Sequence, residues 1–352
     1  MLKRILIILA LLFIVAMAAV YALNSYYQQM LQPVDTAAED EYKVIEIPSG
    51  AGTESIASIL YEERLIQNEL AFRFYARRNE LDRGFIAGQY KLSPAMRLAE
   101  IAALIQKGEV YHETIWFTIP EGFKIEEIAA RLTEENLVEE EEFLSLARNP
   151  SENILSRFPY LREIDSTEVE YMLEGYLFPD TYEITGEFNE EEIIVLMMQR
   201  LDQIISSPDF VAALEEREYS LHEILTLASI VEREGRVDHE RALIAGVFYN
   251  RLRIGQPLES CATVQYVLGE TKEFLTTADT MIPSPYNTYL HAGLPPGPIA
   301  APGETSIRAA LFPEESDYFY FNYKYDDTGE HYFSRTLQEH NENVRKAEQN
   351  LD

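Results

Sequence analysis

The chain has 352 residues, 47% of them hydrophobic, so it is long enough for a membrane anchor and roughly two domains with buried cores. Asp and Glu number 60 against 29 Lys and Arg, a formal net charge of −31. This excess of negative charge repels nucleic acid phosphates and anionic lipid surfaces, which argues against a nucleic acid partner and leaves insertion as the route to a membrane. Cys261 is the only cysteine, so an intramolecular disulfide is excluded and the thiol is interpreted as structural.

The N-terminus carries a segment of the length that crosses a membrane. Lys3 and Arg4 precede an uncharged apolar run over residues 5–23, which as a helix spans about 28 Å against a hydrocarbon core of ~30 Å. The next basic residue is Lys43, and acidic residues lie before it, so the positive-inside rule predicts a cytoplasmic N-terminus and an external remainder. We favour an uncleaved anchor over a signal peptide cleaved near Ala16-Met-Ala18.

The region after the anchor predicts a mixed α+β domain. Residues 1–30 are assigned to a cytoplasmic stub and the anchor, and residues 31–42 to an acidic stalk in which Pro33 stops any continuing helix. A folded module then covers residues 43–110, with Thr53 expected to cap its first helix. The expected elements are strands at 44–47 and 88–92 and helices at 53–63, 70–78 and 98–106.

Part of this pattern recurs in the second domain, residues 111–352. Ile47-Pro-Ser-Gly50 matches Ile119-Pro-Glu-Gly122, and a later strand and helix, at 182–184 and 191–201, resemble those of the first copy. We therefore expect a second partial repeat near 115–138, followed by an insertion. The alternative is a chance similarity between two ordinary strand–helix pairs.

The rest of the chain combines helices with ordered loops. An apolar pattern predicts a buried helix at 221–234, and a second helix at 241–252 ends before Gly255. Residues 283–313 are rich in Pro and Gly and predict rigid loops, where functional sites are often found. Alternating aromatic residues predict a strand at 318–325, paired with a strand that begins at 331.

Two acids, Glu232 and Glu234, lie at the end of the apolar helix. Loss of hydration favours the neutral form of a carboxyl, which is the condition for a general acid in glycoside cleavage. Both residues lie at the edges of the apolar surface, so periodicity leaves the choice between them open. Either one could instead form a salt bridge with an arginine, and the candidates are Arg233, Arg236 and Arg241.

Other catalytic machinery has no counterpart in this sequence. The six histidines are scattered, and there is no metal-binding motif, no phosphate-binding glycine loop and no Gly-x-Ser-x-Gly turn. We therefore expect no metal and no cofactor, and acid–base chemistry by carboxyl groups is the leading option.

Six segments resemble the signature motifs of one family, the MltG (YceG-like) endolytic murein transglycosylases. They occur in the expected order, and the resemblance covers nearly the whole chain, including the anchor and a LysM-like module at residues 43–110. The segments are Glu174-Gly-Tyr-Leu-Phe-Pro-Asp-Thr-Tyr182, Leu227-Ala-Ser-Ile-Val-Glu-Arg-Glu234, Val247-Phe-Tyr-Asn-Arg-Leu252, Ala262-Thr-Val-Gln-Tyr266, Ser284-Pro-Tyr-Asn-Thr-Tyr289 and Gly293-Leu-Pro-Pro-Gly-Pro-Ile299.

The resemblance implies a lyase that cuts peptidoglycan strands, with Glu232 as the catalytic acid. Glu232 would protonate the oxygen between N-acetylmuramic acid and N-acetylglucosamine and then take the proton of the muramic acid 6-hydroxyl, giving a 1,6-anhydro end. Candidates for holding the sugars are Gln265, Tyr286 and Asn287, with loop-stabilising hydrogen bonds as the alternative role for each. This chain has Cys261-Ala262 where many members have an Asp-containing pair, which leaves any role of that Asp open.

The resemblance also implies a setting. The anchored enzyme would act on nascent glycan strands outside the cytoplasmic membrane, ending their growth beside peptidoglycan synthases such as penicillin-binding proteins. The LysM-like module resembles a glycan-binding module, and its alternative role is that of a structural platform.

Three alternative functions remain at this point. A muramidase would hydrolyse the same bond and needs a second carboxylate or a positioned water; the candidate carboxylates are Glu174, Asp180, Glu234 and Glu259. A non-catalytic wall-binding scaffold would show no activity. A cytosolic pyridoxal-phosphate lyase is disfavoured by the export signal and by the absence of a lysine in a recognisable Schiff-base context.

Overall fold

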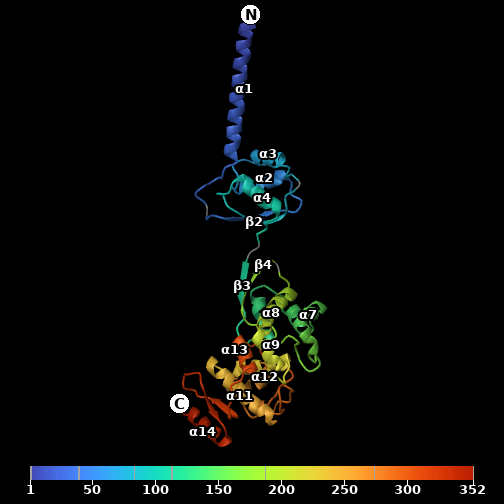
Figure 1. Ribbon diagram of the computed structural model, residues 1–352, viewed down its shortest axis with the longest axis vertical. Helices are drawn as coiled ribbons and strands as arrows, with labels where there is room; N and C mark the ends of the chain where they lie inside the picture. Colours follow the sequence, from blue (N-terminus) through green and yellow to red (C-terminus); the bar gives the residue numbers. More distant parts are fainter. Residues whose placement is uncertain are drawn as a thin grey trace. The chain divides into compact units, whose positions relative to one another are not determined.

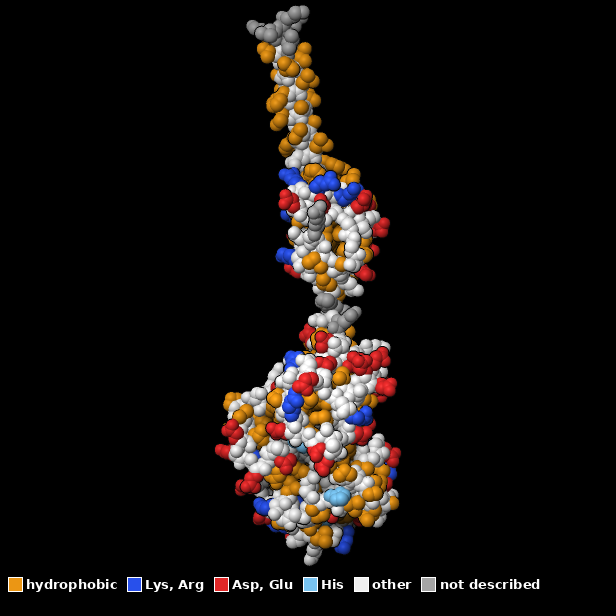
Figure 2. Space-filling view, turned by 90° about the vertical axis from the view of Figure 1, so that its right-hand side faces the viewer, with side chains coloured by type: hydrophobic (Ala, Val, Ile, Leu, Met, Phe, Trp, Pro, Cys, Tyr) orange, Lys and Arg blue, Asp and Glu red, His pale blue; other side chains and the backbone are white. Residues whose placement is uncertain are grey.

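A computed structural model describes residues 2–38, 40–82, 84–111, 114–186, 188–272 and 274–351. The chain divides into two compact units, residues 1–113 and 114–352. Helices predominate and are accompanied, within the described ranges, by three two-stranded antiparallel sheets (Figure 1), so the predicted mixed α+β class is confirmed. Acidic side chains are dispersed over the visible face of each unit (Figure 2).

The first helix, α1 (Leu2–Met30), contains the apolar segment (Figure 1). Its residues 6–30 are long and apolar enough to cross a membrane, and the most apolar 18-residue window within them has a mean hydropathy of 3.0 and is not buried by other described parts of the chain. The helix continues past residue 23 because its last turns have a folded neighbour. Tyr27 and Met30 pack against the core of the first unit, together with Leu31.

The segment after α1 lies against the first unit. The backbone N–H groups of Val34 and Asp35 donate to the carbonyl of Pro94 over 3.0 and 3.1 Å. The Ser93 hydroxyl donates to the carbonyl of Ala38, which is buried, over 2.9 Å. Residues 31–38 of the expected stalk are therefore attached to the unit by backbone hydrogen bonds.

The first unit packs one sheet against three helices. Strand β1 (Lys43–Ile47) pairs with β2 (Gly88–Leu92), and alternate side chains, including Ile45 and Tyr90, are buried against the helices. Thr53 is the first residue of its helix and its hydroxyl contacts Asp82, while Gly52 occupies the cap position, so the expected Thr53 cap is wrong. The helices are α2 (Thr53–Glu62), α3 (Glu69–Arg78) and α4 (Leu98–Lys107).

The second unit opens with the same order of elements. Strand β3 (Thr114–Thr118) pairs with β4 (Thr181–Thr185), and each strand is followed by a helix, α5 (Ile125–Glu134) and α8 (Glu190–Ile205). The turn before α5 has Gly122 at a φ of +77°, and the matching turn of the first unit has Gly50 at +78°. Only glycine adopts this left-handed conformation without strain, which explains its place in both turns. Between β3 and β4 the chain also forms α6 (Glu140–Arg148), α7 (Glu152–Arg157) and η1 (Pro159–Glu163).

Three of the remaining helices pack on α10 (Leu221–Glu234), whose bounds are those predicted from the sequence. Ser220 caps it and forms a capping box with Glu223, and Ile224 to Val231 are all buried. The following helix begins at Asp238, three residues before the expected start. Its first turn is polar and was therefore not recognised by the apolar pattern. The elements are α9 (Pro208–Glu215), α11 (Asp238–Arg253), α12 (Cys261–Leu268), η2 (Asp279–Met281), α13 (Glu304–Leu311) and α14 (Leu337–Glu348), and the three helices that pack on α10 are α11, α12 and α13.

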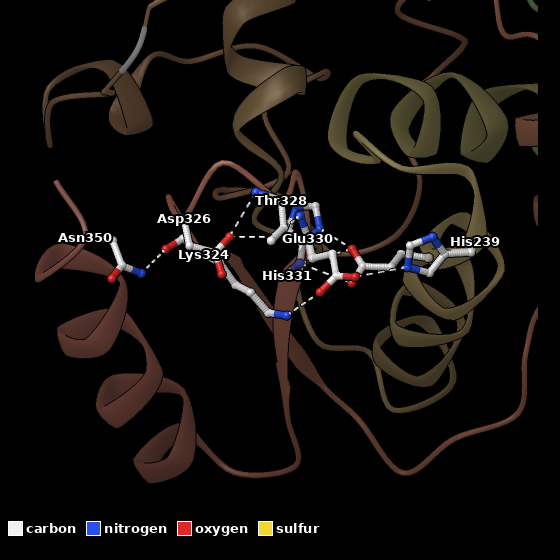
Figure 3. Close-up of polar contacts among 8 residues, drawn as sticks. His239, Lys324, Asp326, Thr328, Glu330, His331 and Asn350 are labelled. Carbon is white, nitrogen blue, oxygen red and sulfur yellow. Dashed lines mark hydrogen bonds and ion pairs between the residues drawn. The ribbon is translucent and has the colours of Figure 1, made fainter.

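Strands β5 (Tyr320–Tyr323) and β6 (His331–Ser334) form a C-terminal hairpin that is fixed to α11. Nδ1 of the buried His331 lies 2.7 Å from Glu240 Oε2, and the His331 N–H donates to both oxygens of the same carboxylate. Figure 3 shows the neighbouring pairs, in which Lys324 and His239 both reach Glu330, over 2.6 and 3.4 Å. The hairpin is therefore tied to the N-terminal turn of α11.

Candidate active site

The C-terminal turn of α10 holds Glu232 in a fixed, buried position. Its side chain is 6% exposed. Glu232 Oε1 lies 3.0 Å from Arg241 Nη1 of α11, and Oε2 accepts the backbone N–H of Gly303 over 2.9 Å. Arg241 also donates to Ser306 of α13 and to Asp238, over 2.5 and 3.1 Å. The salt bridge to an arginine, which the sequence left open for this acid, is therefore present in the structure.

A second carboxylate, that of Glu121, lies beside the first. It comes from the Pro120-Glu121-Gly122 turn, which docks on the segment before α13: the Gly122 N–H donates to the carbonyl of Ala301, and the Ala301 N–H to that of Phe123. A Cβ on Gly303 would lie 2.0 Å from Glu121 Oε1, so the Glu121 carboxyl touches Gly303, the residue that donates to Glu232. Desolvation, followed by the negative charge of Glu232, raises the pKa of Glu121.

Glu121 was missed at the sequence level. Its turn was recognised only as one half of the repeat, and the first copy has Ser49 at the matching position. The replacement of Ser by Glu in the second copy was the available signal. Nothing in the spacing links position 121 to positions 232 and 303, because a tertiary contact brings them together.

The neighbouring acid, Glu234, has a different environment. Its carboxylate accepts the Ser260 hydroxyl over 2.5 Å and the Ala262 N–H over 3.4 Å, at the N-terminal end of α12. The Cys261 sulfur lies 3.2 Å from the Tyr289 hydroxyl, and desolvation together with the Glu234 charge raises the pKa of the thiol. A raised pKa opposes formation of the reactive thiolate, in keeping with a structural cysteine.

The three residues predicted to hold sugars make contacts within the loops. Asn287 is 1% exposed and donates to the carbonyls of Thr280 and Ile282, over 3.1 and 2.8 Å. Gln265 donates to the Lys272 carbonyl over 2.8 Å. Tyr286 is buried with its ring centroid 4.9 Å from that of Tyr266. Across the described ranges none of the three hydrogen-bonds to Glu232, and the contacts of Asn287 and Gln265 are those of the loop-stabilising alternative.

The carboxylates considered for a muramidase mechanism are each engaged by other groups. Glu174 is 2% exposed and accepts from the Ile125 N–H and the Tyr266 hydroxyl. Asp180 pairs with Arg200 over 2.6 Å, and Glu259 pairs with Arg251 over 3.0 Å. With Glu234 bound at α12, two other described carboxylates share a contact with Glu232: Asp238 through Arg241, and Glu121 through Gly303.

The Glu232 site, a buried acid with a second carboxylate beside it, lies within a region matched by one family model. The description of that model is the YceG-like family, and it covers residues 45–346. The chain therefore belongs to the YceG-like family.

The relatives of this chain agree with that assignment. The endolytic murein transglycosylase of Bacillus subtilis (strain 168) is 34% identical over 326 residues, which is 91% of this chain and 89% of the relative. The endolytic murein transglycosylase of Streptococcus pneumoniae (strain D39) is 32% identical over 343 residues, but the match spans only 60% of that longer protein. The crystal structure of a yceG-like protein from Listeria monocytogenes matches with a TM-score of 0.60 and 36% identity, over 86% of this chain and 99% of that one.

The burial of Glu174 predicts a stability that depends on pH. Desolvation raises the pKa of Glu174 from its ordinary value of 4.5 to about 8. Between these values the folded chain binds a proton that the unfolded chain has lost, so stability should fall as pH rises through this window, by at most about 1.4 kcal/mol per pH unit. Glu174→Gln should flatten the dependence in urea unfolding curves recorded from pH 5 to 8. Glu134→Gln, an exposed acid at the end of α5, is the control; parallel curves for wild type and Glu174→Gln would contradict the prediction.

Proposed function

We propose that this chain is an endolytic murein transglycosylase in which Glu232 is the general acid and base. The observation that carries the proposal is the position of Glu232 at the end of the buried helix α10, in the Ala-Ser-Ile-Val-Glu segment of a chain that belongs to the YceG-like family. Relatives that align over 91% of this chain are named for this activity.

The contacts of Glu232 suit a residue that gives up a proton and takes it back. Protonated Glu232 delivers its proton to the glycosidic oxygen, and the bond from that oxygen to the muramic acid C1 breaks. The resulting carboxylate is stabilised by the Arg241 guanidinium and by the Gly303 N–H, 3.0 and 2.9 Å away. It then removes the proton of the 6-hydroxyl as that oxygen attacks C1. The attack is intramolecular, so proximity supplies much of the acceleration and no water is consumed.

Hydrolysis of the same bond is the second candidate. It needs a further carboxylate to activate water, and the candidate is Glu121, whose carboxyl contacts Gly303, the residue that donates to Glu232. The masses of the products separate the two reactions: a 1,6-anhydro end from the transglycosylase and a reducing end from the hydrolase.

The anchor and the first unit complete the proposal. Helix α1 crosses the cytoplasmic membrane with its N-terminus inside, and the rest of the chain lies outside, where it ends nascent glycan strands near penicillin-binding synthases. The unit that contains residues 43–110 acts as a LysM-like module that binds glycan. Its support is the two-stranded sheet with three packed helices and the sequence resemblance at these residues.

Replacing the acid tests the assignment of Glu232. Glu232→Gln keeps the volume but cannot deliver a proton, so release of 1,6-anhydro products from purified peptidoglycan should fall by roughly 10²–10⁴-fold, toward the upper end because the residue acts twice. We also predict a loss of stability of about 1–3 kcal/mol, because the Arg241 guanidinium loses its charged partner.

Glu234→Gln is the matched control, since its amide can still accept from Ser260. Both variants should be assayed at a temperature where circular dichroism shows them folded. Near-normal release by Glu232→Gln, with loss of release by Glu234→Gln, would exclude the assignment.

A reporter fusion tests the orientation. The basic N-terminus and the acidic flank after the apolar run predict an external C-terminus. Alkaline phosphatase fused after Asp352 should be active, whereas β-galactosidase at the same position should not. The reverse pattern would overturn the orientation and, with it, access to the wall.

Deletion of residues 43–110 tests the glycan-binding role of the module. The second unit has its own hydrophobic core, so the helix that carries Glu232 should still fold. Digestion of intact sacculi should slow, while digestion of short soluble glycan fragments should be less affected. Undiminished digestion of sacculi would leave the module as a structural platform only.

A further inference from the structure

Glu121 and Glu232 form a pair of carboxylates around one backbone position. The Gly303 N–H donates to Glu232 Oε2 over 2.9 Å, and the space beside the Gly303 Cα is filled by the carboxyl group of Glu121. The Glu232 side chain is buried, whereas Glu121 is an exposed residue whose carboxyl points into the same site. Two acids that are 111 residues apart in the sequence therefore meet at one point. The Arg233–Gly122 hydrogen bond joins the same two elements.

The charges around this pair do not balance. Arg241 is the cation that contacts Glu232, and it is shared with Asp238 and hydrogen-bonded to Ser306. Arg233 of the same helix end is directed to the Gly122 carbonyl, 3.1 Å away, and to Thr271. Two neighbouring carboxylates facing one shared guanidinium repel each other when both are ionised, so such a pair retains a proton more readily than a single acid would.

The inference rests on the proposed function of Glu232. The repulsion favours a protonated pair, which the reaction requires. A general acid must carry a proton near neutral pH, yet Arg241 and the Gly303 N–H both stabilise the ionised form of Glu232. An adjacent negative charge opposes these two contacts. Desolvation, and after it the charge of Glu232, raise the pKa of Glu121, so the repulsion also acts on the other member of the pair.

We propose that Glu121 is a positioning residue that shares a proton with Glu232 and so keeps the buried acid protonated at the pH at which the enzyme works. At rest the pair holds one proton. Glu232 passes it to the glycosidic oxygen and recovers a proton from the muramic acid 6-hydroxyl, so the pair ends the cycle in the state in which it began. Glu121 itself forms no bond to the sugar.

The pH dependence of kcat/KM tests the proposal. Full-length enzyme in detergent micelles is assayed on a soluble glycan oligomer from pH 4 to 9. In Glu121→Gln the like charge is gone and the pair loses its proton more easily. The decline of kcat/KM on the alkaline side should therefore move to lower pH by about one unit, with activity partly kept at acidic pH. Glu121→Asp, which retains the charge, should restore most of the wild-type profile.

A second variant displaces Glu121 without altering it. Gly303 has φ −73° and ψ 167°, which alanine adopts freely, and the atoms nearest to the added Cβ all belong to the Glu121 carboxyl, the end of a flexible side chain. Gly303→Ala keeps the N–H that donates to Glu232 and pushes the Glu121 carboxyl away, so the alkaline limb should move in the same direction. Glu304→Gln removes an exposed charge at the next position and should leave the limb in place.

The outcomes separate the inference from the proposed function. If the wild type releases 1,6-anhydro ends and Glu232→Gln is inactive, the proposed function stands. Two results for Glu121→Gln would then overturn the inference. A kcat/KM that is lowered equally at every pH would mark a structural role for Glu121. A loss of reducing-end products alone would mark a role in hydrolysis. If Glu232→Gln remains active, the proposed function fails first.

Discussion

The ion pair between Glu232 and Arg241 is the constraint around which the second unit is organised. Both side chains are nearly inaccessible to solvent, and removing two charges from water costs several kcal/mol per ion unless their partners are accurately placed. The partners come from three helices: Glu232 from α10, Arg241 from α11, and Ser306 and the Gly303 N–H from α13 and the residue that caps it. The mutual packing of these helices must therefore satisfy the polar partners of one carboxylate as well as the apolar core that they share.

The sequence predicted the parts of this arrangement that depend on local patterns. The bounds of α10 follow from the Ser220–Glu223 capping box and an unbroken apolar stripe, and the pairing of β6 with an aromatic strand follows from alternation. The start of α11 was misplaced because its first turn, with Asp238 and Glu240, is polar; those acids suit a helix N-terminus but do not extend the apolar pattern. Thr53 was misassigned as a cap because Gly52, one residue earlier, already occupies that position.

The site itself was predicted only where one segment contained it. Glu232 could be found because the motif around it is continuous, whereas Glu121 joins it through a turn that docks on Ala301 far along the chain. The loop sequences allowed even less of the site to be predicted. The segment between α12 and residue 283 leaves backbone carbonyls without regular partners, and Asn287 and Gln265 donate to those of Thr280, Ile282 and Lys272. Polar residues in such loops have the same appearance in a sequence whether they bind a ligand or the backbone.

Two consecutive residues of α11 bind different parts of the second unit. Arg241 pairs with Glu232, and Glu240 binds His331 of the hairpin. Glu232 and Arg241 are nine residues apart in the sequence, whereas Gly303 follows Glu232 by 71 residues and Glu121 precedes it by 111. During synthesis from the N-terminus, Glu121, Glu232 and Arg241 are therefore all made before Gly303 and Ser306. The site cannot be complete until residue 306 has been added, and the hairpin that is fixed to α11 through His331 follows later still.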